Sequence, residues 1–203
     1  MLIMSSLFFS LLPLMVFAFV SSITPGPNNI MLTSSGIRFG FLRSIPHMLG
    51  IAFGFGVMLA LCAMGIGSLI LAVPVLHLGL KVAGSGYLVY LAWQLRRIAF
   101  RKDEGEDQRP MTFLGAALFQ FANPKAWVMA ITGVAAFLPV VQPVALAIAL
   151  FCFVFCAVNL PCIAVWAGAG SVLRRYLAQP KWQRVFCVVM VVLTLYAAAA
   201  IWM

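Results

Sequence analysis

Acidic residues are nearly absent from this sequence. The four that it contains all lie between positions 103 and 107, and only 8% of its 203 residues are charged. Soluble globular domains carry about 25% charged residues, so this chain has too little polar surface to fold in water. Its hydrophobic content of 65% instead predicts an integral membrane protein without a separate soluble domain.

Motifs of several enzymes and nucleotide-binding proteins are also missing. No GxxxxGK[ST] sequence occurs, so no P-loop nucleotide is expected. Ser85 is followed by no histidine that could act as the base of an intramembrane protease. The net charge of +9 does not indicate nucleic-acid binding, because the basic residues lie at the ends of apolar runs, where membrane proteins carry topology signals. The chain is therefore predicted to be no enzyme and to need no cofactor or metal.

Long apolar runs, by contrast, are abundant. A bilayer core about 30 Å thick needs about 20 apolar residues per helix. Six spans are predicted, at about 2–35, 45–72, 75–95, 111–138, 143–169 and 184–202. No basic segment precedes the first span, which is therefore interpreted as a retained helix and not a signal peptide. The expected fold is one all-α, lipid-embedded transmembrane domain over residues 1–203.

The basic residues predict how this domain is oriented. The first, third and fifth loops hold eleven of the 13 Lys and Arg residues, the second holds Lys81 alone, and the fourth holds none. Loops rich in Lys and Arg stay in the cytoplasm. Both termini are then expected to face outward, and the charged segment 96–110 is expected to be a cytoplasmic loop.

Two spans contain strong helix breakers at similar depth. In "SSITPGPNNIML" (21–32), Pro25 lies 13 residues before Arg38, and "NPK" (123–125) lies a comparable distance after Arg109. At 1.5 Å per helical residue, both breaks fall near the middle of the bilayer. Each break opens one half of the chain, about 1–98 and 110–203. Halves of three spans each have opposite orientations, which predicts an inverted repeat with the paired broken spans at a transporter's substrate site.

The chemistry of the breaks indicates what they bind. Irregular backbone at membrane depth is tolerated only where it is buried in protein or lines a wet cavity. A helix restarting at Pro27 presents free N–H groups and its positive dipole end, which suit a carboxylate. Carbonyls freed by Pro25 and Pro27, with the amides of Asn28 and Asn29, suit an ammonium group. The breaks are therefore expected to hold a zwitterion.

Lys125 leaves two interpretations open. No acidic residue lies in any predicted span, and an unpaired lysine near the centre of a span costs about 2.5–3.5 kcal/mol. Either an anionic group of the substrate pairs with Lys125, or the lysine caps carbonyls at the break or extends to an interface.

Four further features each have a functional and a structural interpretation. Asn159, just before Pro161, either lines the cavity or packs in the fifth span. His47, at the cytoplasmic start of the second span, either couples transport to protons or is an interfacial histidine without such a role. Gly50 and Gly54 form a small-residue face for packing within the bundle or in a homodimer. The cysteines Cys152, Cys156 and Cys162 either pack as small hydrophobes or belong to a thiol–disulfide carrier.

The motifs "TPGPNNIMLTSSGIRFGF" (24–41), "FANPKAW" (121–127) and "AAFLP" (135–139) resemble the LysE/RhtB-type amino acid exporters over essentially the whole chain. "TPGPNN" followed by two serines is most similar to the cysteine/O-acetylserine branch of that family. The resemblance implies a bacterial inner-membrane protein that exports small amino acids or their derivatives, driven by the proton motive force.

The family motif falls on residues that the helix breaks also select. An exporter of another small solute remains an alternative. The expected substrate-binding residues are Thr24, Pro25, Gly26, Pro27, Asn28, Asn29, Asn123, Pro124, Lys125 and Asn159, with His47 as the candidate for proton coupling.

Overall fold

The computed structural model describes residues 2–66, 72–75, 109–138, 143–173 and 179–200, together with scattered positions between 78 and 93. Over these residues the secondary structure is helical, without strands. The helices are α1 (Leu2–Ile23), α2 (Pro27–Phe39), the short 3-10 turn Leu42–Ser44, α3 (Ile45–Ala63), α6 (Phe113–Ala122), α7 (Pro124–Phe137), α8 (Val144–Leu173) and α9 (Pro180–Ala200). Only scattered positions of the predicted third span and the last two residues of the charged loop 96–110 are among the described residues.

The described helices are apolar and long enough for a membrane protein. Leu42–Ala63 and Val144–Leu173 could each cross a bilayer, and α1 and α2 could do so together as a pair bent by 56°. α3 ends at Ala63, where Met64 and Gly65 form a turn in which Gly65 has φ 101°. Residues 67–71 of the predicted second span lie outside the described residues. α8 runs unbroken through Pro161 and packs against α1, α2 and α3.

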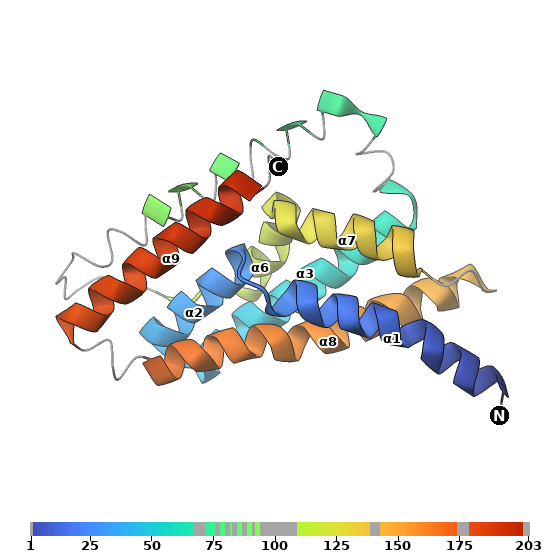
Figure 1. Cartoon of the computed structure of the whole chain (residues 1–203), viewed down its shortest axis with the longest axis horizontal. Coiled ribbons are helices and arrows are strands. Elements are labelled where there is room, and N and C mark those ends of the chain that lie inside the picture. Colours follow the sequence, from blue (N-terminus) through green and yellow to red (C-terminus); the bar gives the residue numbers. More distant parts are fainter. Residues whose placement is uncertain are drawn as a thin grey trace.

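Two consecutive pairs of helices, α1–α2 and α6–α7, each pack on one helix from the other half of the chain. α1 and α2 contact α8, whereas α6 and α7 contact α3, and α3 and α8 contact each other. Figure 1 shows α8 extending along most of the molecule, with α1 at one end of it, α2 at the other and α9 at the outer edge. The junctions α1–α2 and α6–α7 are thereby held inside the bundle.

Glycines allow two of these helix pairs to approach closely. A Cβ at Gly36 of α2 would lie 3.0 Å from the Ala167 carbonyl carbon of α8, and one at Gly170 would lie 3.0 Å from the Thr33 carbonyl carbon. Cβ atoms at Gly50 and Gly54 of α3 would likewise collide with the backbone of α6. The Gly50–Gly54 face is thus buried inside the bundle, as one of the two interpretations expects.

Candidate functional site

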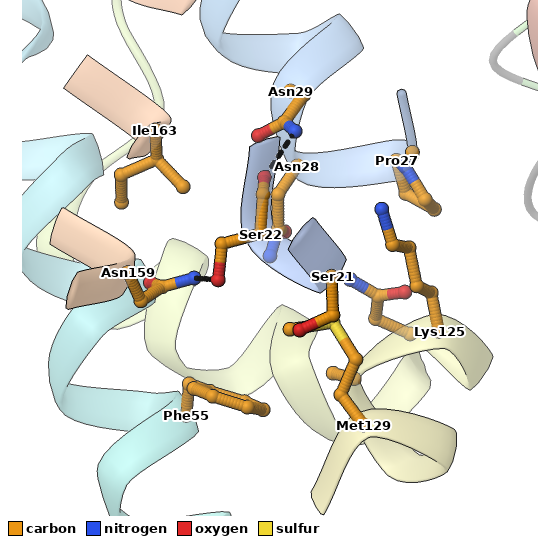
Figure 2. A pocket seen from close by; sticks show the side chains of 13 residues that line it. Ser21, Ser22, Pro27, Asn28, Asn29, Phe55, Lys125, Met129, Asn159 and Ile163 are labelled. Carbon is orange, nitrogen blue, oxygen red and sulfur yellow. Dashed lines mark hydrogen bonds between the residues drawn. The ribbon is translucent and has the colours of Figure 1, made fainter. Parts of the chain in front are cut away.

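A pocket lies where the two helix junctions meet. It has about 320 Å³ of empty space, part of it open to solvent. Its walls come from the end of α1, the start of α2, the α6–α7 junction, α3 and α8 (Figure 2). Seven of the predicted binding residues line it, namely Gly26, Pro27, Asn28, Asn29, Asn123, Lys125 and Asn159.

At the first junction, helix α1 ends at Ile23 and α2 begins at Pro27. Gly26 is extended (φ −176°, ψ 177°), and its carbonyl oxygen accepts the first hydrogen bond of α2 from the Ile30 N–H at 3.0 Å. No side chain caps the N-terminus of α2. The positive end of the α2 dipole therefore lies at the pocket wall without a capping side chain.

The carbonyl groups at the end of α1 already have hydrogen-bond donors. Asn29 Nδ2 donates to the carbonyl oxygens of Ser22 and Thr24, each at 2.8 Å. Trp166 Nε1, from α8, donates to the Ile23 carbonyl oxygen at 3.1 Å. The carbonyls of Ser22, Ile23 and Thr24 thus have hydrogen-bond donors within the protein, and an ammonium group at this break would have to share or replace these bonds.

Lys125 reaches the same break from the start of α7. Its Nζ donates to the Thr24 carbonyl oxygen at 2.8 Å, to Thr24 Oγ1 at 2.9 Å and to the Pro25 carbonyl oxygen at 3.2 Å. A Cβ on Gly26 would lie 2.6 Å from Lys125 Cδ, so the glycine leaves room for the lysine. These contacts agree with the interpretation that Lys125 caps carbonyls at the break. All three acceptors are neutral, however, and none of the described residues is acidic, so the charge of Lys125 has no counter-ion among them.

Asn28 and Gln120 join the two junctions directly. Asn28 Nδ2 donates to Gln120 Oε1 at 2.8 Å, and Gln120 Nε2 donates back to Asn28 Oδ1 at 3.2 Å and to the Ala116 carbonyl oxygen at 2.9 Å. Gln120 is fully buried. The sequence alone does not identify Gln120 as a site residue. Its only signal is a glutamine within an apolar run, three residues before Asn123.

Two amide oxygens in the pocket walls have no partner among the described residues. Asn123 separates α6 from α7, with φ −95° and ψ 105°, and its side chain does not cap α7. Asn159 Nδ2 donates to Ser22 Oγ at 2.9 Å. The Oδ1 atoms of Asn123 and Asn159 are buried without a hydrogen bond. A buried acceptor left unpaired costs about 1–3 kcal/mol, which makes both oxygens candidates for contacts with a ligand.

The remaining predicted residues lie around the pocket or away from it. Thr24 and Pro25 are exposed and contribute oxygens to Lys125, while Pro124 is buried at the first position of α7. His47 is 2% exposed near the start of α3, does not line the pocket, and has no partner for either ring nitrogen in the described part of the chain.

The five cysteines are free thiols. Over the described ranges, no three His, Cys, Asp or Glu side chains gather in a way that could hold a metal ion. None of the cysteines lines the pocket. The pocket is instead built from amides, one amine, helix termini and apolar side chains, which are groups that bind a solute.

Comparison with known proteins agrees with this type of site. The model of the LysE type translocator family matches residues 19–202. Proteins called cysteine/O-acetylserine efflux protein from Escherichia coli strain K12, E. coli O157:H7 and Shigella flexneri serotype 5b are 32% identical over 192 residues, which covers 91% of this chain and 93% of theirs. No solved structure matches the chain. The chain therefore belongs to the LysE type translocator family and is a membrane transport protein, not an enzyme.

Proposed function

We propose that this protein exports small, neutral amino acids or their derivatives from the bacterial cytoplasm across the inner membrane. The observation that carries the proposal is the pocket between the two helix junctions, where Lys125 lies beside buried amide groups without an acidic partner among the described residues. The names of the relatives, cysteine/O-acetylserine efflux protein, support a small amino acid cargo.

The pocket offers complementary groups to both ends of a zwitterion. A cargo carboxylate would take the place of a neutral oxygen at Lys125 Nζ, forming a stronger charge-assisted hydrogen bond near the uncapped start of α2. The unpaired oxygens of Asn123 and Asn159 would accept hydrogen bonds from donors on the cargo. Figure 2 shows Lys125 and Asn159 on opposite sides of the pocket, with Ser21 and Ser22 between them.

The proposed transport cycle uses two inverted halves of three spans each. The packing supports this, because α1 and α2 of one half lie on α8 of the other, while α6 and α7 lie on α3. Asn28 and Gln120 tie the halves together beside the pocket. Rocking of the halves about this point would expose the pocket alternately to each side of the membrane, with both termini outside.

Transport of a neutral, small cargo is tested first with purified protein in liposomes. Counterflow of labelled serine, cysteine, alanine and O-acetylserine is expected, whereas lysine and glutamate should exchange at least about tenfold more slowly. A lysine side chain would meet no acidic residue among those lining the pocket and would be repelled by Lys125. A glutamate side chain would be buried without a partner, because Lys125 is already paired with the backbone carboxylate of the cargo. Protein-free liposomes are the control. Faster exchange of lysine than of serine, or no exchange of any amino acid, would contradict the proposal.

The proton motive force is the proposed driving force, with His47 as the group that carries the proton. An exposed histidine titrates near neutral pH. His47 is buried on α3 away from the pocket, so it would take up a proton in a state of the cycle in which water reaches its ring. A His47→Gln variant is expected to exchange cargo at the wild-type rate but to lose the stimulation of net efflux by a pH gradient. Net efflux and counterflow are measured in the same vesicles, with and without a protonophore. Wild-type stimulation in the variant would exclude His47 from this role.

A further inference from the structure

The apolar side of the pocket consists of a few tightly held side chains. Phe55 from α3, Ala126 and Met129 from α7 and Ile163 from α8 all line it. Their exposed fractions are 2%, 2%, 8% and 1%. These residues therefore form the boundary of the space left for the cargo side chain, which the amides and Lys125 do not bind.

Met129 is placed so that it meets that part of the cargo. It lies four residues after Lys125, which puts both side chains on one face of α7, about one helical turn of 5.4 Å apart. Figure 2 shows both Met129 and Phe55 below Ser21 in this view, and both side chains line the pocket. A cargo held by Lys125 at its carboxylate would thus direct its side chain between Met129 and Phe55.

The Phe55 ring and the Met129 side chain differ in how easily they can change conformation. The Phe55 ring packs edge-on against Phe155 at a centroid distance of 5.2 Å, and Phe155 packs in the same manner against Phe151 at 6.1 Å and Phe17 at 6.0 Å. This aromatic cluster fixes Phe55. Met129 is unbranched and adaptable, so its length determines how much space is left in front of the fixed ring.

We propose that Met129, opposite the fixed Phe55 ring, sets the upper size limit for the side chain of the cargo. The inference rests on the proposed function and names its specificity determinant. The apolar side chains that line this part of the pocket are more than nine-tenths buried and leave little free space beside them. The wild-type pocket is therefore expected to accept short, uncharged side chains such as those of alanine, serine and cysteine, and to exchange leucine, methionine and phenylalanine slowly.

The test compares cargo of increasing length in the same vesicles. Wild-type counterflow of alanine, 2-aminobutyrate, norvaline and norleucine is expected to fall by about tenfold or more at one methylene step, since one methylene in an apolar site changes discrimination by about 10–200-fold. Met129→Ala should move this step toward longer cargo and raise norleucine and methionine exchange by at least about tenfold, with alanine exchange retained. Ala126→Leu should fill the pocket and abolish exchange of every cargo.

Matched variants keep the result interpretable. Val128→Ala, on the 64% exposed position next to Met129, should leave the length profile unchanged, and Met129→Leu, which conserves volume, should keep the step in place. The inference would be overturned if Met129→Ala folds and exchanges cargo with the same length dependence as the wild type. It would also be overturned, even if Met129→Ala does not fold, if exchange by the wild-type protein shows no step with cargo length. Absence of wild-type exchange for all amino acids would instead refute the proposed function.

Discussion

Gly170→Val is expected to prevent the protein from accumulating in a stable, folded form. A Cβ at this position of α8 would lie 3.0 Å from the Thr33 carbonyl carbon and 3.1 Å from the Ile37 nitrogen of α2. Both obstacles are backbone atoms, so no side chain can turn away and the two helices must separate. Overpacking costs about 1–3 kcal/mol even when side chains can adjust, out of a total stability of about 5–15 kcal/mol.

The measurement is thermal unfolding of the purified protein in detergent, together with its yield as a single species in size-exclusion chromatography. Gly168→Val is the matched control, because it makes the same change two residues away, where an added Cβ would meet only Phe41 Cδ2 at 3.9 Å. Gly168→Val should melt close to the wild type. Equal melting temperatures for the two variants would show that the α2–α8 contact does not need Gly170.

Local chemistry explains which parts of this site could be predicted from the sequence. Proline lacks an N–H group and disfavours the helical conformation of the residue before it, so the end of α1 and the starts of α2 and α7 could be anticipated from Pro25, Pro27 and Pro124. The rule is not absolute, because α8 continues through Pro161. The small-residue face of Gly50 and Gly54 was also evident. The helix that packs against this face was not evident, because the spacing of residues along one helix does not say which other helix, or which copy of the chain, lies against it.

The contacts between distant segments could not be derived in this way. Gln120 pairs with Asn28 across 92 positions, and nothing in the apolar run around Gln120 distinguishes a bridging amide from one that bonds to its own helix. Asn29 likewise has the polar amide side chain expected of a substrate ligand, yet this amide donates to a carbonyl at the end of α1. A polar residue at a helix break can serve the backbone or a substrate, and only the positions of the neighbouring carbonyls separate the two roles.

Replacing Lys125 with methionine is expected to reduce transport by about 10–150-fold, since hydrogen bonds to a charged group contribute about 1.5–3 kcal/mol and about 1.4 kcal/mol corresponds to a factor of ten. Methionine keeps most of the length of the side chain, so the loss reports the charge. The cargo carboxylate and the Pro25 carbonyl would lose the lysine as a donor, whereas the Thr24 carbonyl would keep its hydrogen bond from Asn29 Nδ2. Lys181→Met is the control, because Lys181 is exposed at the start of α9 and its replacement should leave transport unchanged.

Amide analogues of the cargo separate the two roles of Lys125. Wild-type protein should exchange serine in strong preference to serinamide, which lacks the carboxylate, whereas Lys125→Met should exchange both equally slowly. A capping role alone would lower the melting temperature and leave the preference for serine intact, because the lysine would then contact only the Thr24 and Pro25 oxygens. A folded Lys125→Met protein that still prefers serine therefore contradicts a carboxylate contact, and loss of that preference places the cargo carboxylate at Nζ.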